Sequence, residues 1–329
     1  MTLLSWTEKN TRAAFSGDAA NRHGIRTEAQ LRKLAISDLL LAQFNDVVIE
    51  KIGLDFRKEP RHEQERRVRR CAHAVGFEDE GSFVGWLVSS PLTQDQIEKL
   101  AMHLTVDEGS YFFRDQRSLS LLHHHILPEL IQSRRGGDQR LGIWSAGCCT
   151  GEEPYSLAIL LDQLIPDKQK WSITIFGTDI NAQSLQKARE GIYDERSLSG
   201  VPSSIRNQYF NRKETGIFEI LPRIKKMVKF SFLNLLEWQS SLPLHDTNEM
   251  DLICCCRVLR YFAPHDVHQV TERLCRSLVK GGWLAISPGE VSCALFSHCV
   301  AVNFPGVYLY QKEKHRTRTR VSFTPGSRH

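Results

Sequence analysis

Two patterns of hydrophobic and polar positions succeed one another along the chain. From residue 31 to residue 104, hydrophobic residues recur three and four positions apart, which is the spacing of amphipathic helices. Gly53 follows the first such stretch, as a glycine does where a helix ends. The helices predicted here cover residues 31–53, 61–77, 81–89 and 93–104. We therefore expect a small all-helical N-terminal domain at residues 31–104, after a polar arm at residues 1–30.

After Arg140 the pattern changes to short apolar runs that alternate with helical stretches. The predicted strands cover residues 141–147, 172–180, 228–234, 250–259 and 281–289. The predicted helices between them cover residues 154–165, 181–190 and 265–279. This alternation predicts an α/β fold, a doubly wound parallel sheet with helices on both faces. We expect it to occupy residues 105–312, and we expect the basic tail at residues 313–329 to be disordered.

Composition narrows the class of protein. The chain is 41% hydrophobic and 25% charged, which are ordinary values for a soluble globular protein. No apolar run approaches the roughly 18 residues of a membrane span, and the first residues lack the apolar stretch of a secretory signal. The net charge of +5 is too small to indicate a nucleic-acid partner, and it suits an acidic protein surface. Nine cysteines without a CxxC pair favour a reducing, cytoplasmic location.

The predicted helix at residues 61–77 is dense in arginine. Arg66, Arg67, Arg69 and Arg70 are expected to cover much of its surface. One interpretation is a basic face that contacts only solvent. The other is a docking surface for an acidic helical partner. The sequence leaves both open.

A glycine-bounded loop joins the first predicted strand to the helix after it. Gly147 and Gly151 flank this loop, at the sheet edge where α/β proteins bind nucleotide-like ligands. Asp179 ends the second predicted strand, where an acid can accept hydrogen bonds from both hydroxyls of a ribose. The alternative is that Asp179 caps the next helix. Glu152 and Glu153 would repel a pyrophosphate, whereas they suit a cationic adenosyl ligand such as S-adenosylmethionine.

Two further groups of residues carry possible chemistry. Cys148, Cys149 and residues 254–256 follow the first and fourth predicted strands, which are neighbours in a sheet of this type. These thiols are either buried apolar filler or an oxidation-sensitive site. Residues 123–125 are consecutive histidines, which point in different directions on a helix. Without a second group of ligands they do not indicate a metal site.

The loop and its flanking segments resemble one known family. The motif WSAGCCTGEEPYSLAI, which begins at Trp144, is similar to the signature of the CheR-type chemoreceptor methyltransferases. Four further motifs occur in that family's order and spacing: LTVDEGSYFFRD upstream, and TDINAQSLQKAREGIY, FLNLLEW and VLRYF downstream. The arginine-rich helical part resembles the family's N-terminal domain. The resemblance covers about residues 31–312.

The resemblance implies a fold and a reaction. It implies a Rossmann-like methyltransferase sheet with a short β-extension at about residues 210–230. The enzyme would be a protein-glutamate O-methyltransferase that uses S-adenosylmethionine and releases S-adenosylhomocysteine. Its partner would be the acidic helical cytoplasmic region of bacterial chemoreceptors, bound through the basic helix around Arg66 to Arg70. Neither nucleic acid nor membrane insertion is implied.

The resemblance also implies the site. The cofactor would lie over the loop from Ala146 to Gly151, with its ribose on Asp179 and its methionine end under Ser110 and Arg114. The residues implied to bind the cofactor are Glu108, Ser110, Arg114, Ala146, Gly147, Gly151, Glu153, Asp179, Asn234, Leu235, Cys256 and Arg257. Arg114 and Tyr261 would be catalytic. An ionised carboxylate needs no strong general base. Arg114 would hold either the substrate carboxylate or the cofactor carboxylate, and Tyr261 would donate one orienting hydrogen bond.

The chain departs from the family pattern after the fourth predicted strand. The family usually has Cys-Arg-Asn-Val before Ile-Tyr-Phe, whereas this chain has Cys256 for the arginine, Arg257 for the asparagine and Arg260 for the isoleucine. One alternative is therefore a catalytically weakened module that binds S-adenosylmethionine and regulates a chemosensory system. Another is a methyltransferase that acts on a different carboxylate or on a small molecule.

Overall fold

The computed structural model describes residues 36–105, 109–237, 250–290, 298–304 and 307–313. The predicted arm, Glu108 and nearly all of the predicted tail lie outside these residues. The chain divides into two compact units, Met1–Ser37 and Asp38–His329, and every element described below belongs to the second unit.

Among the described residues before Leu104, the chain forms four helices, close to the positions that the hydrophobic spacing predicts. They are α2 (Asp38–Ile52), α3 (Arg61–Ala74), α4 (Glu80–Ser89) and α5 (Gln94–Leu104). Side-chain caps set the starts of α4 and α5: Asp79 accepts a hydrogen bond from the backbone N–H of Ser82, and Thr93 and Gln96 form a capping box at α5. The left-handed backbone of Gly53, with φ of 84°, ends α2.

The segment before the sheet is also helical. It consists of α6 (Gln116–Leu121), a π-helical turn η2 (Leu122–Ile126) and α7 (Leu127–Arg134). The three consecutive histidines lie in η2. Across the described parts of the chain, no group of three or more His, Cys, Asp or Glu side chains is placed to hold a metal ion.

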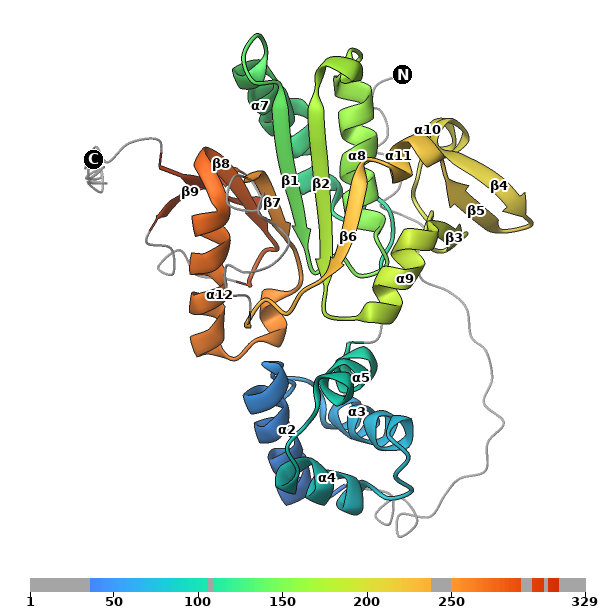
Figure 1. Cartoon of the computed structure of the whole chain (residues 1–329), viewed down its shortest axis with the longest axis vertical. Helices are drawn as coiled ribbons and strands as arrows, with labels where there is room; N and C mark the ends of the chain where they lie inside the picture. Colours follow the sequence, from blue (N-terminus) through green and yellow to red (C-terminus); the bar gives the residue numbers. More distant parts are fainter. Residues whose placement is uncertain (1–35, 106–108, 238–249, 291–297, 305–306, 314–329) are drawn as a thin grey trace, which may run out of the picture. The chain divides into compact units, whose positions relative to one another are not determined.

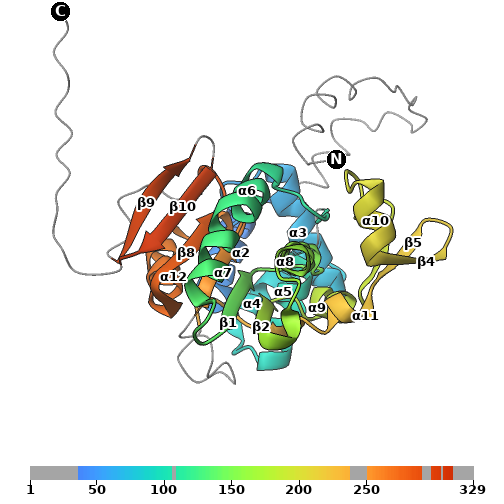
Figure 2. The same cartoon turned by 90° about the horizontal axis from the view of Figure 1, so that it is seen from above.

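Within the described residues, the large sheet has seven strands in the order β6-β2-β1-β7-β8-β10-β9. They are β1 (Arg140–Ala146), β2 (Ser172–Asp179), β6 (Val228–Phe232), β7 (Met250–Cys255), β8 (Leu278–Ile286), β9 (Cys299–Phe304) and β10 (Val307–Lys312). The strands from β6 to β8 are parallel, which confirms the doubly wound fold (Figures 1 and 2). Two further strands, which were not predicted, make the sheet mixed at one side, where β10 runs antiparallel to β8 and β9. A connection as short as that between β9 and β10 can join only antiparallel strands.

Helices flank this sheet and enclose its core. The principal ones are α8 (Glu152–Leu164), which contacts β1 and β2, α9 (Ala182–Glu190), which contacts β2 and β6, and α12 (Pro264–Ser277), which contacts β8. Every residue of β7 is buried, as expected for a central parallel strand that is covered on both faces. Two short 3₁₀ turns, η3 (Lys168–Lys170) and η5 (Leu259–Tyr261), complete the connections.

A smaller antiparallel sheet stands apart from the large one (Figure 1). Its order is β3-β5-β4, from β3 (Ile192–Asp194), β5 (Ile217–Ile220) and β4 (Phe210–Glu214), with α10 (Ser203–Tyr209) and α11 (Pro222–Lys225) beside it. Two of its strands fall in the predicted β-extension. The strand β3 precedes that range and was not predicted, because three residues carry no recognisable alternation.

The segment after α2 connects the helical part to the sheet. Leu54 forms an antiparallel bridge with Phe262, and the N–H of Asp55 donates to the carbonyl of Tyr261 at 2.6 Å. The ring centres of Phe56 and Tyr261 are 6.3 Å apart. These contacts fix the segment that carries Tyr261.

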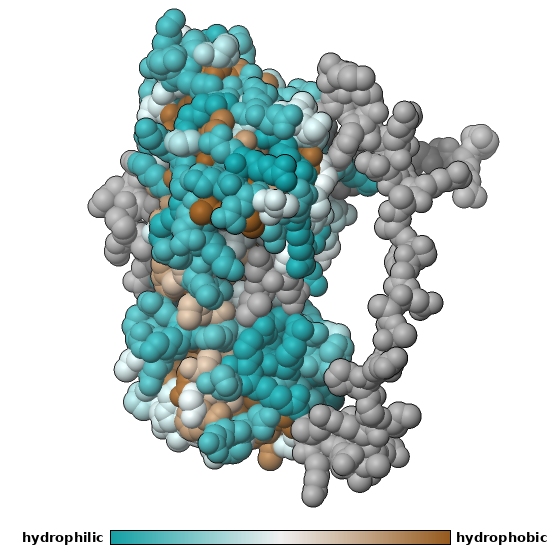
Figure 3. All heavy atoms as spheres, turned by 90° about the vertical axis from the view of Figure 1, so that its right-hand side faces the viewer, coloured by the Kyte–Doolittle hydropathy of each residue, from teal (hydrophilic) through white to brown (hydrophobic). Residues whose placement is uncertain are grey.

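The surface in Figure 3 is mostly hydrophilic, with hydrophobic residues scattered over it. Within the described ranges, the large hydrophobic side chains that are exposed come from separate elements: Leu39, Val88, Ile192, Val300 and Tyr308. None of the helices in the described ranges combines the length and apolar composition that crossing a bilayer requires.

Candidate functional site

A cavity of about 260 Å³ lies at the carboxyl ends of β1, β2 and β7. The chain order reverses at β1, which has β2 on one side and β7 on the other, and such switch points are where open α/β sheets bind ligands. The predicted site residues that line it are Ser110, Arg114, Gly147, Glu153, Asp179, Asn234, Leu235, Cys256, Arg257 and Tyr261. Ala146 and Gly151 are buried and do not line the cavity.

The loop after β1 has a backbone shape that favours glycine. The φ angles of Gly147 and Gly151 are 77° and 95°, both left-handed. A Cβ atom on Gly147 would lie 2.3 Å from Cγ2 of Val258, and one on Gly151 would lie 2.9 Å from Cβ of Ala188. Both positions therefore require glycine, for the turn and for the close approach of neighbouring side chains.

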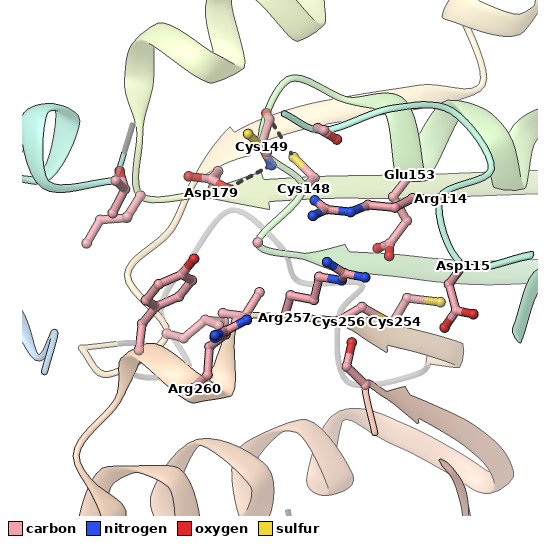
Figure 4. A pocket seen from close by; sticks show the side chains of 18 of the residues that line it. Arg114, Asp115, Cys148, Cys149, Glu153, Asp179, Cys254, Cys256, Arg257 and Arg260 are labelled. Carbon is pink, nitrogen blue, oxygen red and sulfur yellow. Dashed lines mark hydrogen bonds between the residues drawn. The ribbon is translucent and has the colours of Figure 1, made fainter. Parts of the chain in front are cut away.

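Asp179 is fixed at the cavity wall by two backbone groups. Its Oδ2 accepts from the N–H of Cys149 at 2.8 Å (Figure 4). Its Oδ1 accepts from the N–H of Asn181 at 2.8 Å. The alternative that Asp179 caps α9 is wrong, because Asn181 is the N-cap and its side chain accepts from the N–H of Ser184. Asp179 instead holds the loop after β1 against the end of β2.

Glu153 is a carboxyl group in an unfavourable position for a negative charge. Burial raises its pKa, and the carboxyls of Asp115 and Glu290 add to that effect. The hydroxyl of Ser145 donates to its Oε1 at 2.6 Å and acts in the opposite direction, as does a hydrogen bond from Cys256. A cation bound in the cavity would offset the cost of ionising Glu153.

Arg114 presents an unsatisfied donor to the same cavity. Its Nε is buried and makes no hydrogen bond within the described residues. Its guanidinium carbon lies 5.4 Å from the centre of the Tyr111 ring. The preceding residue, Phe113, has a left-handed backbone with φ of 57°, and its N–H donates to Oγ of Ser156 on α8 at 3.0 Å. The segment before the sheet is therefore held over the start of α8 in a strained conformation.

The turn after β7 is held by one carboxylate. Glu290 accepts from the N–H of Arg257 at 2.8 Å and from the N–H of Arg260 at 3.2 Å. Arg257 has a left-handed backbone with φ of 63°, an uncommon conformation for a residue other than glycine. Figure 4 shows the guanidinium groups of Arg114 and Arg257 in the part of the cavity where Glu153 and Asp115 lie, and that of Arg260 apart from them.

Cysteines at the carboxyl ends of two neighbouring strands line the same cavity. Ser145 of β1 pairs with Cys254 of β7, and Cys148, Cys149, Cys254 and Cys256 all line the cavity. Burial raises the pKa of Cys148, of Cys254 and of Cys256 well above the usual value of a thiol. Oxidation requires thiolate, so these pKa directions favour the interpretation of apolar filler.

The expectation that four arginines cover the surface of α3 is wrong for Arg67. Arg67 is 3% exposed and pairs with Glu59 through two hydrogen bonds of 2.7 and 2.8 Å. Its guanidinium carbon lies 4.1 Å from the centre of the Phe56 ring, and it also donates to the carbonyl of Leu104. Arg66 is exposed, whereas Arg69 and Arg70 are half-buried.

Three charged residues that line the cavity were not predicted to lie there: Asp115, Arg260 and Arg67. Asp115 follows the Phe-Phe-Arg segment and caps α6 by accepting from the N–H of Ser118. Arg260 departs from the family pattern, and that departure was the one sequence signal for it. Arg67 gave no signal, because its role depends on partners outside its own helix.

The polar groups of the cavity define the ligand that it fits. A carboxyl group that burial disfavours as an anion suits an ammonium or sulfonium cation. A fixed aspartate at the end of β2 suits ribose hydroxyls, and a buried guanidinium donor suits a carboxylate. These three groups together fit a zwitterionic adenosyl ligand.

Comparison with known proteins gives the same result. The family model "CheR methyltransferase, SAM binding domain" matches residues 108–294. "Chemotaxis protein methyltransferase 1" of Pseudomonas aeruginosa is 32% identical over 230 residues, which cover 68% of this chain and 81% of the relative. "Chemotaxis protein methyltransferase" of Salmonella typhimurium is 31% identical over 267 residues, 79% of this chain and 86% of the relative. "Chemotaxis protein methyltransferase 2" of Vibrio cholerae is 28% identical over 262 residues, 79% and 88% respectively.

Proposed function

Because the chain belongs to the CheR methyltransferase family, with S-adenosylmethionine as its cofactor, we propose that it methylates glutamate side chains of bacterial chemoreceptors. The product would be a glutamyl methyl ester. The observation that carries this proposal is the combination of Glu153, Asp179 and Arg114 around one cavity at the carboxyl ends of the parallel strands. The reaction would take place in the cytoplasm, where the acidic helical region of such receptors lies.

Each cofactor group has a matching residue. Asp179 would hold the ribose, Asn234 and Leu235 the adenine, and Glu153 the ammonium group. Asn234 and Leu235 are buried at the cavity, just after β6, which ends at Phe232. Ser110, Arg114, Cys256 and Arg257 would surround the methionine end. When bound, the cofactor supplies a methyl group on a positively charged sulfur.

The protein then has to orient and desolvate the accepting carboxylate. No general base is required, because a glutamate is already ionised at neutral pH. Tyr261 lines the cavity, and the Phe56 ring and the N–H of Asp55 hold it in place. We assign it the role of donating one hydrogen bond that aligns the accepting oxygen.

Receptor docking would use the exposed part of α3. Arg66 has a side chain that is 57% exposed, so it can meet an acidic helix, whereas Arg67 is committed to Glu59 and Phe56. The mostly hydrophilic surface in Figure 3 fits recognition by charge better than by burial of a large apolar face. Such docking would weaken as the salt concentration rises.

A second candidate is a module that binds S-adenosylmethionine without transferring its methyl group. Cys256 favours this candidate, because a half-buried neutral thiol stands where the family has an arginine. Arg257 favours the enzyme, because its guanidinium extends into the cavity from the next position (Figure 4).

Labelling separates the two candidates. The full chain is incubated with methyl-labelled S-adenosylmethionine and receptor cytoplasmic domains, with Asp179→Asn as the matched variant. Base-labile label on glutamate, lost in the variant, supports the methyltransferase. Calorimetric binding of S-adenosylhomocysteine without any transfer supports the regulatory module. Label on another carboxylate or on a small molecule would show a methyltransferase with a different substrate. If S-adenosylhomocysteine does not bind, both candidates are overturned.

A further inference from the structure

Arg260 is a cation at the cavity that the cofactor does not explain. It is exposed, it lines the cavity, and it replaces an isoleucine of the family pattern. Its guanidinium carbon lies 5.9 Å from the centre of the Tyr261 ring. The cofactor has one carboxylate, for which Arg114 and Arg257 are already placed, and Figure 4 shows Arg260 apart from these two.

The position of Arg260 is fixed by the fold. Its N–H donates to Oε1 of Glu290, and the N–H of Arg257 donates to Oε2 of the same carboxylate. Glu290 therefore holds both arginines on one turn while directing its own oxygens to the backbone. Among the described residues, no hydrogen bond or ion pair engages the Arg260 guanidinium, although Glu290 lies close enough for its pKa to be affected by that charge.

The chemistry of methyl transfer decides which carboxylate Arg260 can serve. The accepting carboxylate loses its negative charge as the ester forms. A guanidinium paired with it would stabilise the starting state more than the transition state and would slow the transfer. A carboxylate that does not react keeps its charge throughout, so pairing with it does not raise the barrier.

We propose that Arg260 binds a second carboxylate of the substrate, one that is not methylated, and thereby selects glutamates that have another acidic side chain nearby. This inference rests on the proposed function. It adds a specificity determinant at the cavity mouth, beside Tyr261, that acts on binding of the receptor and leaves the chemical step unchanged.

A cycle of variants in enzyme and substrate tests the inference. The substrate is a receptor cytoplasmic domain that the full chain methylates, with each acidic residue near the methylated glutamate changed in turn to its amide. The enzymes are the wild type, Arg260→Gln, Arg260→Lys and Arg276→Gln. Arg276 on α12 is a suitable control, because its side chain is 73% exposed and it does not line the cavity.

For the unaltered receptor, Arg260→Gln should raise KM about tenfold with kcat unchanged, as expected for loss of one charge-assisted pair. Arg260→Lys should recover part of this loss, and Arg276→Gln should behave as the wild type. One amide substitution in the receptor should remove the difference between wild type and Arg260→Gln. All variants should bind S-adenosylhomocysteine within about twofold of the wild type, since a uniform-binding contact to substrate leaves the cofactor site intact.

Two outcomes overturn the inference alone. They are an equal loss by Arg260→Gln on every receptor variant, and a weakened affinity for S-adenosylhomocysteine. If instead the wild type methylates none of the receptor domains, the proposed function fails, and the inference fails with it.

Discussion

Arg66 and Arg67 are adjacent arginines on α3, and the same substitution should have a small effect on stability at Arg66 and a large one at Arg67. Arg67→Ala removes a buried guanidinium and leaves Glu59, whose side chain is 23% exposed, without its partner. Breaking a buried ion pair in this way lowers the free energy of unfolding by about 3–5 kcal/mol. Because Glu59 is partly exposed, we expect a loss at the lower end, about 3 kcal/mol. Arg66→Ala removes an exposed pair with Glu63 on the same helix, for which about 0.5 kcal/mol is expected.

Urea unfolding, followed by circular dichroism, measures both free energies. The two variants change the net charge equally, so any difference between them reports burial and not long-range electrostatics. Methylation assays at varied receptor concentration and calorimetry with the cofactor measure the effects on function. Arg66→Ala should raise KM for the receptor and leave cofactor affinity unchanged. Arg67→Ala should weaken both, because the loosened Phe56 ring packs against Tyr261.

The reasoning is refuted if Arg67→Ala costs less than about 1 kcal/mol, the upper value for an exposed pair. Equal losses in the two variants would refute it as well. In either case the basic helix would have to be treated as one solvated surface, as the sequence alone allows.

Three further predictions concern the cavity. Gly147→Ala should lower the free energy of unfolding by about 1–3 kcal/mol and abolish binding of S-adenosylhomocysteine, through the left-handed backbone and the clash with Val258. Gly200→Ala is its control, with φ of 81° and no atom within 4 Å of the added Cβ, and comparable losses in both would disprove a role for the clash. Because burial raises the pKa of Glu153, calorimetry should show full cofactor affinity above that raised pKa and a loss as the pH falls through it. Glu153→Gln should bind weakly with a flat pH profile, and a profile parallel to the wild type would show that another group titrates. Burial also raises the pKa of Cys148, Cys254 and Cys255, so a maleimide at neutral pH should leave them unmodified until the chain unfolds. Mass spectrometry measures the modification, and rapid modification of the folded chain would favour the hypothesis of an oxidation-sensitive site.

The sequence predicts the central sheet well because burial on both faces leaves continuous apolar runs. The strand β7 is buried throughout, and its predicted range contains it. The strands β9 and β10 were not predicted. In β10 the hydrophobic run from Val307 to Tyr310 is only four residues long, and a run this short does not by itself identify a strand. Both strands lie toward one side of the sheet, with β9 at its edge, and such strands depend on their partners more than on their own pattern.

The same distinction applies to the site. Gly147, Glu153 and Asp179 follow strands of a recognisable fold, so their positions at one edge could be predicted. Arg67 and Glu290 could not be placed, because their roles come from partners far along the chain: Glu290 lies 33 residues from Arg257. The left-handed backbone of Arg257 could not be predicted either, because arginine has no local preference for this conformation.

The bridge between Leu54 and Phe262 bears on how this protein can be dissected. The family model begins at residue 108, which suggests a natural cutting point for a minimal enzyme. A fragment made there would lack the bridge and the Phe56 ring, and the segment that carries Tyr261 would lose its outer support. Loss of turnover in that fragment could then come from a less ordered Tyr261 as well as from missing receptor contacts. Single substitutions in the full chain therefore separate receptor recognition from methyl transfer better than truncation does.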